Sequence, residues 1–240
     1  MSNGMNAAPF QITMLTLFPD IFPGPLGCSV LGKARDKGLW DMALINIRDY
    51  ADNKHHNVDD TPFGGGAGMV MRADVIDRAL TACASRKGIL IAPSPKGKVM
   101  DQALAKQFAA GDGLKILCGR YEGIDQRVLD HWDILEVSLG DFVLTGGEIP
   151  ALAMTDAVLR LRAGVIGKPE SLIEESFEDG LLEYPHYTRP VTWQGRAVPE
   201  ILQTGHHQNI AAWRRAQAEA ITKRNRPDLW TKYQDQLQQA

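Results

Sequence analysis

Three glycine-rich segments hold residues whose types and spacing could do chemistry: 63–69, 118–125 and 138–148. The first reads Phe-Gly-Gly-Gly-Ala-Gly-Met. It lacks the Lys-Ser/Thr ending of a phosphate-binding P-loop and follows no predicted strand. Its glycines expose bare backbone amides, so a flat base could approach the chain closely. Composition weighs that interpretation equally against a flexible loop tip.

The second segment, 118–125, has glycines at both ends of a predicted strand-to-helix turn. Glycine permits unusual φ values there and close approach of a ligand. Arg120 and Glu122 could pair with each other, and a tight turn with an internal ion pair is the simpler interpretation. The third segment places Leu139, Phe142 and Leu144 between glycines. Such a surface suits an adenine ring, although the same side chains could simply fill a core.

Other polar clusters give weaker signals. Residues 176–190 are rich in aromatics and proline beside a basic stretch, which indicates either RNA contact or an ordered linker. His55 and His56 precede two aspartates, but we favour a solvated loop and expect no metal site. No Ser/His/Asp constellation is visible, so a hydrolase has no support. No G-x-G-x-x-G follows a strand, which disfavours a nicotinamide-dependent oxidoreductase.

The elements that must position these segments alternate along the chain. Hydrophobic periodicity predicts strands at 12–18, 42–47, 89–92, 114–118 and 134–137, and helices at 30–37, 74–84, 101–111, 124–132 and 148–162. This alternation predicts an α/β domain with a mainly parallel sheet. The loops 93–98, 119–123 and 139–147 follow predicted strands, where parallel sheets bind ligands. Residues 49–68 are predicted to be one long loop.

The composition changes after Gly164. Residues 170–184 carry acidic side chains and no basic one, which indicates a linker. Residues 186–226 then carry seven basic residues against two acidic ones, with helical spacing in the later part. This pattern predicts a small basic helical domain, and the whole-chain net charge of −3 means that any nucleic-acid site must be such a local patch.

The cysteine pattern and the hydropathy of the chain indicate its expected cellular location. Cys28, Cys83 and Cys118 are far apart and odd in number, which argues against a disulfide framework and fits a reducing cytoplasm. Cys118 ends an apolar run and is expected in the core. The N-terminus lacks the pattern of a signal peptide, and no apolar run approaches the ~18 residues of a membrane span, so no membrane partner is expected.

Five stretches, taken in order, resemble the bacterial tRNA (guanine-N1)-methyltransferase family of the SPOUT class. They are LTLFP (15–19), NVDDTPFGGGAGM (57–69), CGRYEGID (118–125), GDFVLTGGEIPA (140–151) and GLLEYPHYTRP (180–190). The polar N-terminus (1–9) is expected to be disordered. The resemblance implies a trefoil-knotted α/β domain (10–163), a linker (164–189) and a small all-helical tRNA-binding domain (190–240). A knotted chain is a rare exception to the rule that protein chains do not thread through their own loops. The resemblance also implies a homodimer whose sites take residues from both subunits.

The resemblance further implies transfer of a methyl group from S-adenosylmethionine to N1 of guanine 37, beside the anticodon of tRNA. The residues expected to bind the donor are Pro93, Ser94, Pro95, Gly119, Tyr121, Glu122, Gly123, Leu139, Gly140, Asp141, Phe142, Val143, Leu144, Gly146, Gly147 and Pro150. Those expected to contact tRNA are Gly64, Gly65, Gly66, Arg189, Arg214 and Arg215. The sequence does not decide whether Mg²⁺ takes part.

By motif position, the resemblance assigns two catalytic residues, Arg160 and Glu175. Guanine N1 is a poor nucleophile until it loses its proton, so a carboxylate must accept that proton while a cation stabilises charge at O6. The family usually has aspartate where this chain has Glu175; Glu174 and Asp179 are rival bases. Ala67 stands where the family commonly has proline.

Two alternative functions stay open at this point. Another SPOUT-class RNA methyltransferase, acting on ribose or rRNA, would share the donor loops but would not need a carboxylate base. A non-catalytic protein that binds RNA or the cofactor would bind the donor without turnover, and Glu175 in place of aspartate is its only support.

Overall fold

The computed structural model describes residues 8–167 and 175–239. Residues 1–7 of the N-terminus expected to be disordered (1–9), residues 170–174 of the acidic stretch (170–184) and the rival base Glu174 therefore lie outside the described residues. The chain divides into two compact units, 1–167 and 168–240, and each is described by itself.

The strands of the structure are β1 (Phe10–Thr16), β2 (Trp40–Asn46), β3 (Asp59–Asp60), β4 (Val70–Met71), β5 (Ile89–Val99), β6 (Gly113–Leu117), β7 (Leu135–Ser138), β8 (Thr192–Trp193) and β9 (Arg196–Ala197). The α-helices are α1 (Ser29–Asp36), α2 (Ala73–Ala82), α3 (Gln102–Ala109), α4 (Gln126–His131), α5 (Glu148–Leu159), α6 (His207–Asn225) and α7 (Pro227–Gln239). Short 3₁₀ helices are η1 (Pro19–Ile21), η2 (Gly24–Gly27), η3 (Ile47–Tyr50) and η5 (Glu200–Gln203).

A five-stranded sheet forms the centre of the first unit, with strand order β2-β1-β6-β5-β7 and every pairing parallel. This confirms the predicted α/β class with a mainly parallel sheet. Almost every residue of β1 is buried, because parallel strands are covered on both faces and so favour continuous apolar runs. The trefoil knot stays a prediction.

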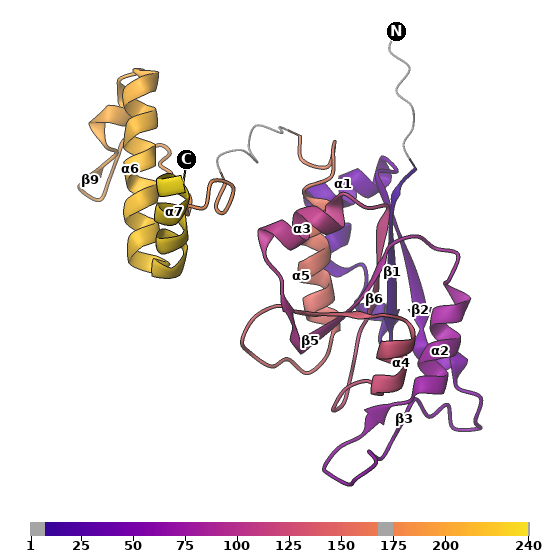
Figure 1. Ribbon diagram of the computed structural model, residues 1–240. Helices are drawn as coiled ribbons and strands as arrows, with labels where there is room; N and C mark the ends of the chain where they lie inside the picture. Colours follow the sequence, from indigo (N-terminus) through magenta and orange to yellow (C-terminus); the bar gives the residue numbers. More distant parts are fainter. Residues whose placement is uncertain (1–7, 168–174, 240) are drawn as a thin grey trace. The chain divides into compact units, whose positions relative to one another are not determined.

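Helices cover both faces of this sheet (Figure 1). One apolar cluster joins the sheet to α1, α3 and α5, with Trp40 and Phe108 among its largest buried side chains. The other joins it to α2 and α4 through residues such as Ile76 and Leu129. Asp101 is the predicted N-cap of α3: its carboxylate accepts a hydrogen bond of 2.8 Å from the amide of Leu104, which satisfies one of the unpaired amides of the first turn.

Two local predictions are wrong. The expected loop 93–98 is an irregular stretch within β5, which pairs with β7 at Pro93 and again at Lys98. A Cβ on Gly97 would lie 2.3 Å from the carbonyl carbon of Glu136, so only glycine allows this close approach. The expected loop 49–68 contains η3 and β3, because β3 pairs antiparallel with β4 across the glycine-rich turn.

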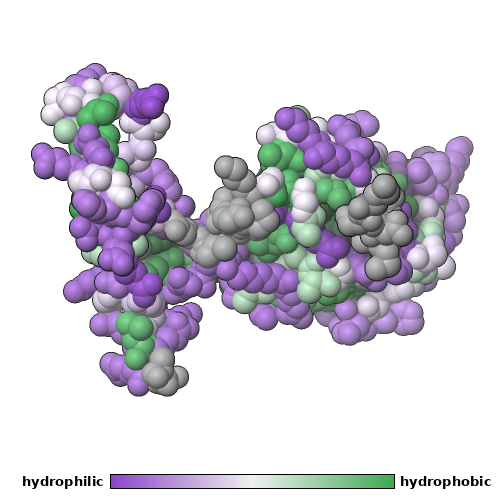
Figure 2. All heavy atoms as spheres, turned by 90° about the horizontal axis from the view of Figure 1, so that it is seen from above, coloured by the Kyte–Doolittle hydropathy of each residue, from purple (hydrophilic) through white to green (hydrophobic). Residues whose placement is uncertain are grey.

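The second unit is built on α6 and α7. Leu181, Ala218 and Tyr233 are buried together, with Tyr184 and Trp230 packed against them. The predicted helix appears as α6, which begins at His207, next to the N-cap residue His206. Hydrophilic side chains cover much of the visible face of each unit (Figure 2). In the part of the chain that the structure describes, no helix is long and apolar enough to cross a membrane.

Candidate functional site

A cavity of about 400 Å³ lies at the carboxyl ends of β6 and β7, beside the irregular middle stretch of β5. Its volume is in the range of small-molecule sites in proteins. The loops 119–123 and 139–147 form much of its wall, with the irregular stretch of β5 and the start of α5. This is the edge at which parallel α/β sheets bind ligands.

Most of the residues expected to bind the donor line this cavity. Those that do are Pro93, Ser94, Pro95, Gly119, Tyr121, Glu122, Gly123, Leu139, Gly140, Phe142, Val143, Leu144, Gly146, Gly147 and Pro150; Asp141 does not. Strand ends that are separated in sequence meet at one sheet edge, which brings the three loops together. Their assignment to the donor remains a prediction.

Glycine is required at several points of the wall. A Cβ on Gly147 would lie 2.8 Å from the Cα of Cys118, and one on Gly146 would lie 2.4 Å from Nε of Arg120. Gly140 has φ +156°, and a Cβ there would meet the ring of Phe142 at 2.9 Å. The walls therefore approach each other more closely than other residues would allow, which leaves backbone amides and apolar side chains facing the cavity.

Arg120 lines the cavity although it is not among the residues expected to bind the donor, and an ion pair between Arg120 and Glu122 was the simpler interpretation of this turn. The structure corrects this: a guanidinium nitrogen of Arg120 lies 2.8 Å from a carboxylate oxygen of Glu148, a buried residue at the start of α5. Glu122 is exposed and lies over Gly68 instead. This pairing could not be predicted locally, because Glu148 is distant from Arg120 in the sequence. The two residues meet only because their segments converge at one edge of the sheet.

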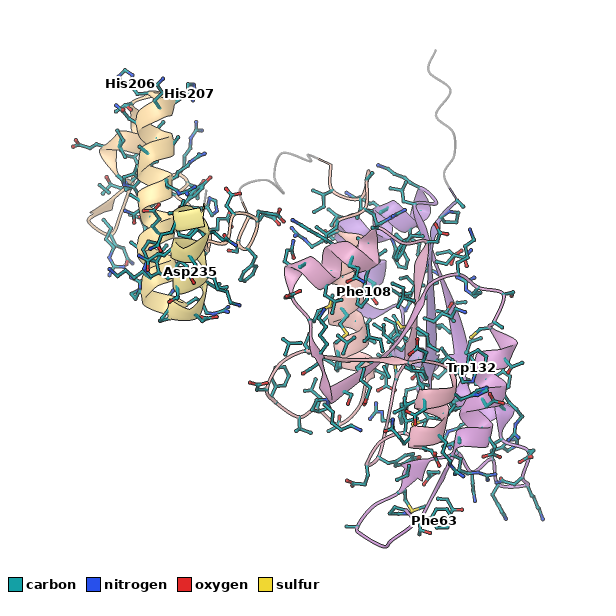
Figure 3. All side chains as sticks on the ribbon, in the orientation of Figure 1. Phe63, Phe108, Trp132, His206, His207 and Asp235 are labelled. Carbon is teal, nitrogen blue, oxygen red and sulfur yellow. The ribbon has the colours of Figure 1, made fainter. Side chains whose placement is uncertain are left out.

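The glycine-rich turn 63–69 is anchored to the rim of the cavity. The amide of Glu122 donates to the carbonyl of Met69 at 2.9 Å, and the amide of Met71 donates to the carbonyl of Gly123 at 2.9 Å. Phe63 lies on the far part of this turn and is 98% exposed (Figure 3). One end of the turn is therefore fixed beside the cavity, and its tip is exposed to solvent.

Tyr121 connects the rim to the segment around β3. Burial raises the pKa of its hydroxyl above the ordinary value, and the negative charge of Asp59 adds to the effect. The hydroxyl therefore stays neutral at physiological pH. Cys118 directly after β6 is fully buried, and burial raises the pKa of its thiol well above the usual range, so the thiol keeps its proton at physiological pH. Its expected place in the core is confirmed.

Arg160 lies at the other end of α5 from the cavity. It is the C-cap of this helix, whereas Pro150 in the first turn lines the cavity. Ten residues of helix separate the two Cα atoms by roughly 15 Å, which exceeds the length of an arginine side chain. Nearby, the guanidinium of Arg162 stacks over the ring of Phe10, the first residue of β1, with 4.9 Å to the ring centroid. Arg160 is thus near the amino edge of the sheet.

Glu175 belongs to the second unit and is half-buried. Its loop folds back on itself: the amide of Phe177 donates to the carbonyl of Leu181 at 2.8 Å. The amide of Leu182 donates to Thr222 of α6 at 2.8 Å. Phe177 has φ +77°, an uncommon conformation for a residue with a large side chain. The loop that carries Glu175 therefore has a defined shape fixed on α6.

The arginines expected to contact tRNA differ in their surroundings. Arg189 is exposed. Arg214 stacks over the ring of Tyr184, with 4.8 Å to the centroid. Arg215 donates to Glu219 at 3.1 Å and to the hydroxyl of Tyr233, so part of its hydrogen-bonding capacity joins α6 to α7. His55 and His56 are exposed, as expected of a solvated loop.

A parallel α/β sheet with a glycine-lined cavity at its carboxyl edge defines an α/β protein with a candidate small-molecule site, followed here by a helical unit. The family described as tRNA (Guanine-1)-methyltransferase TrmD matches residues 10–232. The chain therefore belongs to this family.

Individual relatives agree. Three proteins named tRNA (guanine-N(1)-)-methyltransferase are similar over almost their whole lengths. The one from Rhodospirillum rubrum is 57% identical over 223 residues, which are 93% of each chain. That from Ruegeria pomeroyi is 55% identical over 228 residues, 94% of each chain. That from Chelativorans sp. is 52% identical over 228 residues, 93% of this chain and 96% of the relative.

Proposed function

We propose that this protein transfers a methyl group from S-adenosylmethionine to N1 of guanosine 37 of tRNA. Family membership supports the tRNA substrate and the guanine-N1 product. The single structural observation that carries the proposal is the glycine-lined cavity, with the glycine-rich turn 63–69 anchored at its rim. A cytoplasmic location accords with a tRNA substrate and with the free thiols of Cys28, Cys83 and Cys118.

The cavity fits the methyl donor by size and by chemistry. Flat adenine needs apolar faces and polar edge contacts, which Leu139, Phe142 and the backbone of glycines 140, 146 and 147 offer. When bound, S-adenosylmethionine supplies an already activated methyl group on a sulfonium. The task left to the chain is to hold that methyl group and N1 in line and to exclude water.

Glu175 is the proposed proton acceptor. Its half-buried loop is fixed on α6, which would present a carboxylate to the target base in one orientation. A glutamate differs from the aspartate usual in the family only by a longer arm. Arg160 is the proposed cation at O6, where its guanidinium would stabilise the charge that develops as N1 is deprotonated.

The position of Arg160 supports a homodimer with shared sites. Within one chain, Arg160 is at the opposite sheet edge from the cavity, so it must serve the cavity of another subunit if it serves one at all. Phe142, Val143, Leu144 and Ile149 are exposed apolar residues near the cavity and suit contact with that second copy.

Basic residues of the second unit are the proposed tRNA contacts, in particular Arg189, Arg214 and Arg215, together with glycines 64–66 of the first unit. Arginine binds phosphate through charge-assisted hydrogen bonds, and the stacked Tyr184 holds Arg214 in place. Affinity should therefore fall with salt concentration.

The test is methylation of defined tRNA transcripts with labelled donor, followed by identification of the product nucleoside. We expect 1-methylguanosine with guanine at position 37 and no product when that guanine is replaced by adenine. A methylated ribose, or methylation that ignores the replacement, would show a different RNA methyltransferase. Donor binding without turnover would show a non-catalytic protein.

A further inference from the structure

An ion pair between Arg120 of the cavity wall and the buried Glu148 lies beside the cavity. Arg120 and Glu148 are 2.8 Å apart, and Glu148 is 1% exposed. A buried carboxylate is costly unless charged and hydrogen-bonding partners surround it. The partners of Arg120 and Glu148 therefore show which parts of the structure the ion pair connects. These partners come from separate segments of the chain.

On the carboxylate side, the pair is tied to the end of β1. The hydroxyl of Thr16 donates to the second oxygen of Glu148 at 2.8 Å. The same hydroxyl accepts from the amide of Phe18 at 2.9 Å, which fixes the chain as it leaves the strand. Thr16 is fully buried and is absent from the cavity wall, so it acts on the cavity indirectly, through Glu148 and through Phe18.

On the guanidinium side, the pair joins both loops of the cavity. Arg120 belongs to loop 119–123 and donates to the carbonyl of Thr145 in loop 139–147 at 3.3 Å. Its guanidinium also stacks over the ring of Phe18, with 4.3 Å to the centroid. Beside it, the amide of Gly147 donates to the carbonyl of Gly119 at 2.9 Å. The planar guanidinium thus has a carboxylate, a carbonyl and an aromatic face as simultaneous partners.

We propose that Arg120 and Glu148 are positioning residues for the methyl donor, which set the separation of loops 119–123 and 139–147. The proposal rests on the proposed function, since it needs a donor in this cavity. Arginine is suited to the task because its rigid fork fixes directions, whereas a lysine would supply only a point charge. The pair acts through the loops, and the reacting atoms need not touch it.

The test compares Glu148→Gln, Arg120→Lys and Thr16→Val with the unchanged chain at a temperature where each is folded. Glu148→Gln keeps the shape but turns an amide toward the guanidinium. We expect Kd and KM for S-adenosylmethionine to rise about 10- to 100-fold in the first two variants and about threefold in Thr16→Val, while KM for tRNA stays within about twofold. Arg127→Gln, which removes an exposed ion pair with Asp125 outside the cavity, is the matched control and should change neither value.

A second ligand separates positioning from direct contact. 5′-Methylthioadenosine lacks the amino-acid carboxylate of the donor. Equal losses of affinity for both ligands support positioning, and a loss confined to S-adenosylmethionine overturns it, because Arg120 would then bind that carboxylate.

A purely structural role would also overturn the proposal. In that case the variants would unfold at lower temperature while the folded protein kept its donor Kd within about twofold. Failure of the proposed function looks different, because the unchanged chain would then neither bind the donor nor methylate tRNA.

Discussion

Individual titratable residues have different surroundings for identifiable reasons. Cys118 is surrounded by apolar groups, so its thiol keeps its proton. Glu148, a few ångströms of backbone away through Gly147, has Arg120 and Thr16 as partners. The buried thiol of Cys118 therefore stays protonated, whereas the buried carboxylate of Glu148 is held by specific partners. The candidate base Glu175 is in a third situation, half-buried on the second unit.

Replacing Glu175 by glutamine should abolish proton acceptance with little change in shape. We expect kcat to fall about 10²- to 10⁴-fold, while donor Kd stays unchanged. Single-turnover methylation and donor calorimetry measure the two quantities. Glu174→Gln and Asp179→Asn are the matched controls; if one of these collapses activity and Glu175→Gln does not, the base is assigned to the wrong residue. Glu175→Asp should retain activity.

Replacing Gly146 by alanine tests the close approach of the cavity walls. The added Cβ would lie 2.4 Å from Nε of Arg120, so the guanidinium must move away from Glu148. We expect donor affinity to fall about tenfold, measured by calorimetry. Gly167→Ala is the control, because a Cβ there meets open space. Unchanged affinity in Gly146→Ala would mean that the wall tolerates displacement of Arg120.

Among the structural elements, the turn between β3 and β4 has one end fixed by hydrogen bonds and a tip that is exposed to solvent. The end of the turn next to β4 is hydrogen-bonded to the rim of the cavity. At the tip, a Cβ added to Gly64 or Gly65 would contact no other atom. Four glycines of the turn, at 64, 65, 66 and 68, have left-handed φ values, so the shape depends on them. A large aromatic side chain exposed to solvent at such a tip is accessible for stacking on an unpaired base.

Replacing Phe63 by alanine should therefore weaken tRNA binding and leave donor binding intact. An aromatic side chain can stack on an unpaired base, and such stacking is worth about 1–3 kcal/mol, so we expect the Kd for tRNA to rise about fivefold or more. Filter binding measures it, and Phe63→Trp should restore affinity. An unchanged tRNA Kd with a weakened dimer, seen by sedimentation, would mean that Phe63 contacts the second copy instead.

The start of α7 gives a pH-dependent prediction. A hydrogen bond from Arg226 lowers the pKa of Asp228 from 3.8 to about 2. A lowered pKa in the folded state means that this ion pair stabilises the helix above about pH 4 and that the contribution is lost as pH falls toward 2. The carboxyl resonance of Asp228 should titrate near pH 2, and nearer 3.8 in Arg226→Gln. Arg224→Gln, whose guanidinium contacts Asn225, should leave the midpoint unchanged.

At the scale of the whole molecule, α5 spans the first unit from one sheet edge to the other. Its first turn lines the cavity, and its C-cap Arg160 is at the opposite edge. A helix is rigid over this length, so no local adjustment brings Arg160 to its own cavity. Catalysis that uses both features must therefore involve two chains.

Mixing two inactive variants tests this consequence. Arg160→Ala removes the cation, and Gly146→Val fills the cavity beside Arg120. A heterodimer of the two would have one intact site and one doubly altered site. Random pairing should therefore restore about a quarter of the unchanged activity per subunit. Each variant alone is the control. No recovery after verified subunit exchange would mean that the cavity and Arg160 do not form a shared site.

The sequence by itself determined the local elements and the order in which they follow one another. Hydrophobic spacing over a few residues specified the alternation of strands and helices, and the Asp101 cap of α3 was visible because its partner is three residues away. Glycine-rich loops after strands were equally visible, since a turn at a strand end leaves a local signature. Most of the cavity wall followed from that signature and the resemblance together.

The tertiary structure decided which distant groups meet. Arg120 pairs with Glu148 rather than with nearby Glu122, because the ends of β1 and β6 and the start of α5 converge at one sheet edge. The same packing directs α5 away from that edge and carries Arg160 with it. Local propensity acts over about one turn of helix, whereas partner choice depends on strand order, and no short stretch of sequence contains that order.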